Sequence, residues 1–317
     1  MLNHILIPID GTPSAEYALP HAGAIATALH AHVTLLRIME GSSSTRTTQA
    51  EFVDPWNWQI SKTEAEIQLD KAVQHLQALG IPAEKAILDS PSVSRIVEFA
   101  HEHNVNLIIM AKPGDNFRDL IHELLLRTHL PTLRIRAGDE TMENWKLAHY
   151  GKLLIPLDGS QRAEHVLPLG TMLAQGFNAE LHLVHVVRKP EMPRRAPLSQ
   201  EDIELTDRLI DRNRVEAARY LEQLETRLST GITVKSHLLV DDSVATALHK
   251  LIEREGIDLT ILSAHGYSGE PLWPYGSIAN NLIAYSPKPI LVVQDLPSTL
   301  PVPRDTETAQ RESRERQ

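Results

Sequence analysis

The chain of 317 residues contains no cysteine. This absence excludes disulfide scaffolds, thiol catalysis and cysteine-ligated metals. Aromatic residues make up only 4% of the sequence, so we expect cores built mainly from Leu, Ile, Val and Ala. No apolar run approaches the roughly 18 residues of a membrane helix. The N-terminus reads directly as a strand, without the basic and apolar regions of a secretory signal. We therefore expect a cytoplasmic protein.

Positive charge is also scarce. The sequence has 31 Lys and Arg against 41 Asp and Glu, a formal net charge of −10. A nucleic-acid surface needs a basic patch, and no such cluster occurs, so we do not expect nucleic-acid binding. The hydrophobic content of 42% and charged content of 23% are those of a soluble globular protein. The length suits two domains.

The strongest feature of the sequence is an internal duplication. Residues 6–20 read LIPIDGTPSAEYALP, and residues 154–168 read LIPLDGSQRAEHVLP, a shift of 148 positions. The apolar runs that follow, AHVTLLRI and AELHLVHV, keep this shift, and NLIIMAKPG and DLTILSAHG correspond at a shift of 152. The two halves of the chain are therefore two copies of one domain.

Each copy alternates short apolar runs with amphipathic stretches. This pattern predicts strands near 4–9, 32–38, 82–88, 106–110 and 131–135, and again near 152–157, 180–187, 232–239, 258–263 and 289–293. Helical patterns in the second copy cover about 161–175, 200–229, 243–255 and 277–286. Such alternation is typical of an α/β protein with a parallel sheet covered on both faces. We expect two doubly wound, Rossmann-like or flavodoxin-like domains, each a five-stranded parallel sheet of order 3-2-1-4-5 flanked by helices.

The polar stretches of the sequence suggest the domain boundaries. We expect domain 1 at 1–137, a linker at 138–150, domain 2 at 151–295 and a disordered tail at 296–317. The tail has balanced charges and offers no apolar face, which is typical of disorder.

The expected ligand crevice of the second copy lies between its first and fourth strands. In an open doubly wound sheet, ligands bind at the carboxyl ends of the strands where the strand order reverses. Asp158 stands at the tip of the first strand, beside Gly159 and Ser160. It could accept a hydrogen bond from a sugar hydroxyl or a base edge, or it could simply form a turn or helix cap.

The loop after the fourth strand carries the second part of this expected site. Gly266 and Gly269 allow the backbone to approach a ligand closely. Gly276 and Ser277 open a helix whose free N–H groups and positive dipole end suit a phosphate. No Lys or Arg occurs from 265 to 277, so we expect His265 or a metal ion to supply any positive charge beside the phosphate.

The whole chain resembles a tandem universal stress protein. The family's nucleotide-binding members carry the motif Gly-x2-Gly-x9-Gly-Ser/Thr after the fourth strand. The matching residues keep this spacing, with serine in place of the first glycine: Ser263, Gly266, Gly276 and Ser277.

This resemblance has several implications for the second copy. It implies that ATP or a related adenine nucleotide binds there, with Mg²⁺ as a further expectation. Asp158 matches the family's aspartate on the first strand, and Val186 matches the valine that lies against adenine. The resemblance also implies that the domains pair through their fifth strands, here within one chain, while homodimers of the tandem chain remain an alternative.

The first copy departs from the motif. Gly114 to Pro131 spans 17 positions, against 23 from Gly266 to Pro289, and no Gly-Ser pair precedes the helix. We infer that the first copy keeps the fold and Asp10 but has a degenerate nucleotide loop.

Two other functions remain open for the chain. One is a module that binds an unknown protein partner without nucleotide, and the other is a slow ATPase. No catalytic residues are expected, because neither a hydrolase nucleophile elbow nor a Walker lysine is present. The pairs His30/His32 and His101/His103 have a spacing that zinc can use, but no third ligand is evident, so we expect no metal site.

Overall fold

A computed structural model describes residues 2–39, 55–88, 93–112, 124, 127–138, 145–190, 199–267 and 275–295. The first half of the chain contains five strands: β1 (His4–Ile9), β2 (His32–Ile38), β3 (Ala83–Leu88), β4 (Leu107–Lys112) and β5 (Thr132–Arg136). The second half contains another five: β6 (Lys152–Leu157), β7 (Glu180–Arg188), β8 (Val234–Asp241), β9 (Leu259–Ser263) and β10 (Ile290–Val293). All ten strands lie within two residues of the bounds expected from the apolar runs. The predicted tail and residue 269 fall outside the described residues.

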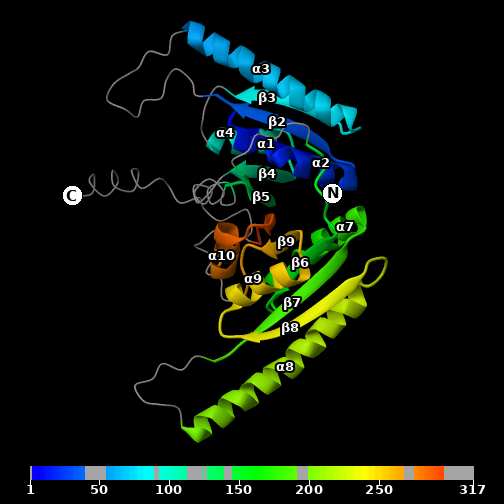
Figure 1. The fold of residues 1–317 in the computed structure, drawn as a ribbon, viewed down its shortest axis with the longest axis vertical. Coiled ribbons are helices and arrows are strands. Elements are labelled where there is room, and N and C mark those ends of the chain that lie inside the picture. The colour runs from blue at the N-terminus through cyan, green and yellow to red at the C-terminus, as the bar shows by residue number, and fades with distance from the viewer. Residues whose placement is uncertain are drawn as a thin grey trace, which may run out of the picture.

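The strands form one continuous sheet of ten strands, in the order β3-β2-β1-β4-β5-β10-β9-β6-β7-β8. Within each half all neighbouring strands are parallel, and the order is 3-2-1-4-5. The halves meet where β5 and β10 run antiparallel, with Leu133 opposite Leu291. Figure 1 shows the two halves stacked along the long axis with these strands at the centre. The predicted pairing of the fifth strands within one chain is therefore present.

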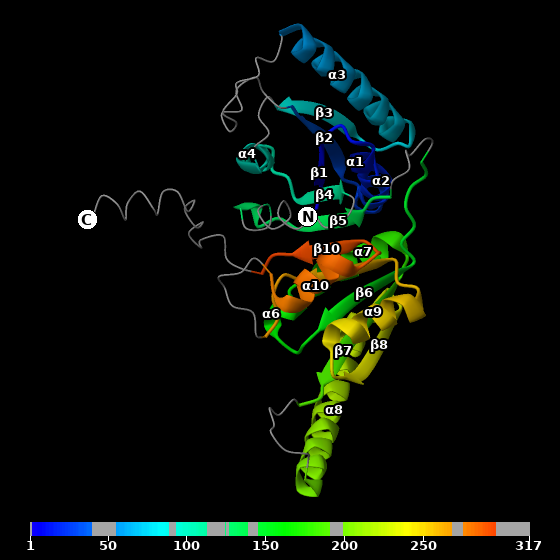
Figure 2. The same ribbon diagram turned by 60° about the vertical axis from the view of Figure 1, so that its left-hand side comes forward.

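Helices cover both faces of the sheet (Figures 1 and 2). One face packs against α1 (Pro13–Glu16), α2 (Ala18–Leu29), α3 (Pro55–Ala78), α6 (Gln161–Glu164), α7 (Leu167–Phe177) and α8 (Gln200–Leu228). The other packs against α4 (Val93–Glu102), α9 (Val244–Glu255) and α10 (Ser277–Tyr285). Each face has its own core, and each core includes strand residues from both halves.

The helix expected at 161–175 is two helices. The short α6 ends at Glu164, and α7 begins at Leu167 with Pro168 in its first turn. Proline has no backbone N–H and suits the start of a helix, so Pro168 opens the second one. The first half repeats the break between α1 and α2.

Contacts between the halves extend beyond the strands. A Cβ built on Gly176 of α7 would lie 2.7 Å from the carbonyl oxygen of Ala28 in α2, so these helices meet backbone to backbone. Residues 145–150, the described end of the expected linker, pack on the first half: the Tyr150 hydroxyl lies 2.6 Å from His21 Nδ1. Burial lowers the pKa of His21 to about 4.

None of the helices in the described part of the chain combines the length and the apolarity that crossing a bilayer requires.

Candidate functional site

Asp158 lies at the carboxyl end of β6 and forms a tight turn. Its Oδ1 accepts hydrogen bonds from Ser160 N (3.0 Å) and Ser160 Oγ (2.6 Å). Gly159 between them has φ +84°, which glycine adopts readily. Ser160 also caps α6, because its Oγ accepts from Ala163 N. The turn expected from the sequence is present.

The second carboxylate oxygen of Asp158 reaches the loop after β9. Asp158 Oδ2 accepts a hydrogen bond of 2.5 Å from Tyr267 N. A Cβ built on Gly266 would lie 2.2 Å from this oxygen, so only glycine allows the loop to approach the carboxylate this closely. Asp158 and Gly266, 108 positions apart in the sequence, are thus in direct contact where the strand order reverses. The side chain of Asp158 is exposed, and its oxygens can accept further hydrogen bonds.

Ser263 and His265, which flank the start of this loop, are both buried. Ser263 Oγ has no hydrogen-bond partner among the described residues and no contact with solvent. His265 Nδ1 lies 2.7 Å from Asp295 Oδ1, and the same oxygen accepts from His265 N at 3.2 Å. The imidazole that we expected to assist a phosphate is therefore held by Asp295, and Ser263 presents no exposed hydroxyl.

Arg162 is a cation near this loop that sequence reasoning missed. Its Nε lies 3.5 Å from Asp295 Oδ2, so α6 contributes a guanidinium to the end of β10. The residue is far from the glycine loop in the sequence, and its position follows only from the folded turn at Asp158.

The expected phosphate end of the site is the start of α10. Gly276 is the N-cap residue, with φ −74° and ψ 173°, and Gly276 N donates to Ala264 O at 2.7 Å. Ser277 is the first residue of the helix. Gly269 lies outside the described residues.

Val186 and α10 lie on the same face of the sheet, since Val186 packs against the core that contains α9 and α10. His185, its neighbour on β7, faces the other way, and its ring contacts Tyr220 of α8. Burial lowers the pKa of His185, and the nearby Asp158 carboxylate only partly opposes this shift. Burial and the carboxylates of Glu164 and Asp158 raise the pKa of Tyr220.

The equivalent turn in the first half has the same bonds but a different surrounding. Asp10 Oδ1 accepts from Thr12 N (3.0 Å) and Thr12 Oγ1 (2.6 Å), as Asp158 does from Ser160. Above Gly11, however, lies the guanidinium of Arg37, with Nη1 only 1.9 Å from a Cβ built on the glycine. A Cβ on Gly159 meets no described atom within 4 Å. Arg37 covers the turn in the first half, whereas no residue in the described part of the chain covers the turn in the second.

Burial lowers the pKa of the Arg37 guanidinium, while the carboxylate of Asp10 raises it. Arg37 occupies the strand position that His185 has in the second half, because each lies opposite the last residue of the neighbouring first strand. The cationic side chain of Arg37 thus lies over the Asp10 turn of the first half.

Comparisons with known proteins fit this geometry. The sequence model of the universal stress protein family matches twice, over residues 1–128 and 149–294. The chain belongs to the universal stress protein family. It carries two copies of the family's domain, as the internal repeat predicted.

Individual relatives agree with this membership. The chain is 30% identical over 159 residues to universal stress protein MJ0577 of Methanocaldococcus jannaschii, which covers 46% of this chain and 95% of that protein. A universal stress protein of Archaeoglobus fulgidus has a similar structure, with a TM-score of 0.67, 18% identity and coverage of 93% of this chain and 100% of that one. A functionally unknown protein of Pseudomonas aeruginosa, PA1789, has a TM-score of 0.62 at 16% identity, with coverage of 100% and 98%. At these identities, the two structures support the fold alone.

Proposed function

We propose that this universal stress protein is a cytoplasmic stress-response protein whose C-terminal half binds ATP or a related adenine nucleotide. The nucleotide would lie across the carboxyl ends of β6 and β9, and its occupancy would regulate a protein partner. ATP would bring Mg²⁺ with it. The observation that carries the proposal is the contrast between the two aspartate turns: no described residue covers the one at Gly159, and Arg37 covers the one at Gly11.

The arrangement of polar groups around the open turn supports a nucleotide. Asp158 has free acceptor capacity at the strand ends, where a ribose or base edge can donate to it. Val186 offers an apolar contact for a base. The N-terminus of α10 offers backbone N–H groups to phosphate, since Gly276 has no side chain to block the approach. Arg162 would supply the positive charge that the glycine loop lacks.

The same groups argue against rapid hydrolysis. Fast phosphoryl transfer needs a base that orients the water and cations that stabilise the transition state. His265 is held by Asp295, and Arg162 is partly neutralised by the same carboxylate. A slow ATPase is the second candidate, and a nucleotide-free interaction module is the third.

A pair of matched variants tests the proposal. Asp10→Ala and Asp158→Ala remove the same two turn bonds, one pair from each half. The melting temperature of each variant is measured with and without millimolar ATP and Mg²⁺. We expect ATP to stabilise the wild type and Asp10→Ala, by about 2.7 kcal/mol when its concentration is 100 times Kd. We expect no such effect for Asp158→Ala.

Two outcomes would overturn the proposal. The first is the absence of any thermal shift or calorimetric heat for the wild type at millimolar nucleotide, which would favour the interaction module. The second is equal loss of binding in both variants. ATP turnover well above background that Asp158→Ala abolishes would favour the enzyme.

A Gly276→Leu variant should stay folded and lose nucleotide binding, because the new side chain would occupy the approach to the N-terminus of α10.

A further inference from the structure

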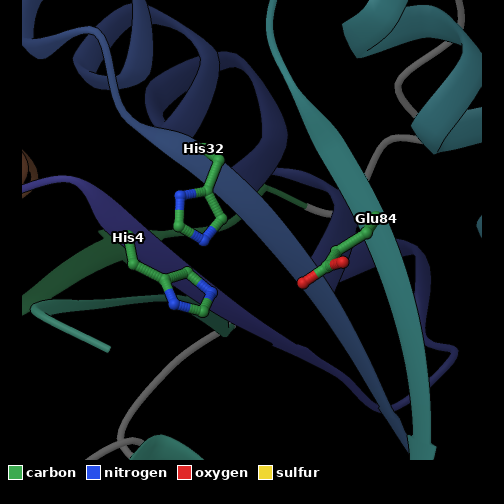
Figure 3. Close-up of side chains that lie close together, drawn as sticks. All are labelled: His4, His32 and Glu84. Atoms are coloured by element: carbon green, nitrogen blue, oxygen red, sulfur yellow. The ribbon is translucent and has the colours of Figure 1, made fainter. Parts of the chain in front are cut away.

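A cluster of two histidines and a glutamate lies at the amino ends of the strands in the first half. It consists of His4 on β1, His32 on β2 and Glu84 on β3, and one ligand atom from each lies within 4.8 Å of the others. Figure 3 shows the two imidazoles stacked and the carboxylate pointing toward them from the neighbouring strand. The ring centroids of His4 and His32 are 3.8 Å apart. His4 is buried, His32 is partly exposed and Glu84 is exposed, so the cluster opens to solvent on one side.

The hydrogen bonds of His4 fix which of its nitrogens faces the cluster. His4 Nδ1 lies 2.8 Å from the carbonyl oxygen of His103, which can only accept, so Nδ1 carries the proton. In the neutral ring, Nε2 is then an acceptor. A ligating histidine typically donates its other N–H in this way to a carbonyl or carboxylate, which holds the ring in place.

With His4 neutral, two hydrogen-bond acceptors in the cluster face the hydroxyl of Thr34, which has only one hydrogen to donate. His4 Nε2 lies 2.8 Å from Thr34 Oγ1, and Thr34 Oγ1 lies 2.9 Å from Glu84 Oε1. The hydroxyl has a single hydrogen, so beside a neutral His4 ring it can donate to the ring nitrogen or to the carboxylate, but not to both. One acceptor faces the hydroxyl oxygen without a hydrogen between them. A cation at this point would satisfy both.

We propose that His4, His32 and Glu84 bind a divalent transition-metal ion of the zinc type. Two imidazole nitrogens and one carboxylate are a ligand set that zinc accepts, with water in the fourth position. Nitrogen ligands disfavour Mg²⁺, which prefers oxygen. The site is separate from the proposed nucleotide crevice and does not depend on it, since it lies on β1, β2 and β3 of the first half, whereas the crevice lies at β6 and β9 of the second half.

The side chains need only a modest movement to close on an ion. Ligand atoms around a tetrahedral zinc lie roughly 3.4 Å apart, given bonds of about 2.1 Å. The largest separation in the cluster is within 4.8 Å, and Glu84 is long and exposed, so its rotamers can shorten that distance.

A second group of similar composition lies in the other half: His182, His237 and Glu255. His182 Nδ1 is 3.0 Å from His237 Nε2, and two neutral rings satisfy this contact with one hydrogen. This group has no proton deficit, so the proposal concerns the first half. Its presence determines how the test must be designed, because it contributes a constant background.

The test compares two neighbouring histidines in the full chain. His32→Asn removes a proposed ligand. His30→Asn changes an exposed histidine two positions away that lies outside the cluster. His30 has φ 54°, and asparagine tolerates this conformation, as Asn178 (φ 52°) does in the second half. Each protein is dialysed against Zn²⁺ alone, and bound metal is counted against protein.

We expect His30→Asn to bind as much zinc as the wild type, and His32→Asn to bind one equivalent less. Glu84→Gln should weaken that equivalent by roughly tenfold or more, at least as much as the loss of an outer-shell partner does. Mg²⁺ at the same concentration should not compete. Circular dichroism establishes that each variant is folded, and all three substitutions avoid the buried His4.

Equal zinc binding by His30→Asn and His32→Asn would overturn the proposal. So would a wild-type chain that takes up no zinc at micromolar concentration. Competition by Mg²⁺ at equal concentration would also contradict it, because an oxygen-only site elsewhere would then account for the metal.

Discussion

Replacing Gly266 by alanine tests the contact on which the candidate site depends. The new Cβ would lie 2.2 Å from Asp158 Oδ2, closer than carbon and oxygen atoms approach without displacement. The carboxylate must move by about 1 Å, and this movement breaks its 2.5 Å bond to Tyr267 N. A hydrogen bond to a charged acceptor contributes about 2 kcal/mol. The backbone of Gly266 is outside the left-handed region, so alanine gains roughly 0.7 kcal/mol by restricting the unfolded chain.

The expected result is therefore a net loss of about 1.3 kcal/mol in the wild type. In an Asp158→Ala background the obstacle is gone, and the same substitution should stabilise the protein by roughly 0.7 kcal/mol. Urea unfolding of the four proteins measures the coupling energy between the two substitutions, which should be about 2 kcal/mol. The dependence of the unfolding free energy on urea concentration is compared among the four proteins. An equal cost of Gly266→Ala in both backgrounds would refute the reasoning, because the clash with Asp158 would then not be its source.

Three further predictions concern stability. Burial lowers the pKa of His21 to about 4 in the folded chain, below the usual value of 6.5. The unfolded chain therefore binds more protons between these values, and stability falls as pH drops through this window, by up to about 3 kcal/mol. Urea unfolding at pH 7 and at pH 4.5 measures how much the free energy of unfolding decreases between the two pH values. His21→Leu should make this decrease smaller, and an unchanged decrease would contradict a buried neutral ring at His21. Gly176→Ala should destabilise by about 1–3 kcal/mol because its Cβ meets Ala28 O at 2.7 Å; a raised melting temperature, the usual effect in a helix, would show that α2 and α7 separate easily. Ser199→Ala should cost about 1 kcal/mol, since Ser199 and Asp202 form a capping box at α8, and an unaltered urea midpoint would argue that this helix end frays freely.

The sequence predicts the fold closely because the strands are short apolar runs separated by polar stretches. Buried parallel strands have this pattern, and the internal repeat supplies each boundary twice. The break between α6 and α7 was missed because apolar residues continue through it, and only Pro168 marks the new start. Asp158 and Gly266 could be predicted as neighbours, since strand order alone brings their loops together.

Other parts of the site depend on distances that a sequence does not encode. Arg162 reaches Asp295 because of the way the turn after β6 folds, and the guanidinium of Arg37 lies over Gly11. The sequence pairs His32 with His30, its neighbour in the chain, whereas the structure stacks it on His4 of the adjacent strand. Pairs across strands depend on register, and no spacing along one strand indicates them.

The joining of β5 to β10 within one chain frees the contact between the halves from symmetry. In a homodimer with a twofold axis, every residue at the contact occurs twice and must suit its own copy. Here the contact contains a single arginine, Arg134, because the equivalent position on β10 is Val292. Arg134 is buried, and its Nη1 donates to the carbonyl oxygen of Ser286 at 2.6 Å. A symmetric pair would bury two guanidinium groups beside the axis, each needing its own acceptors. Fusion lets one half carry the charge while the other supplies the acceptor, so the two copies can diverge without losing their fit.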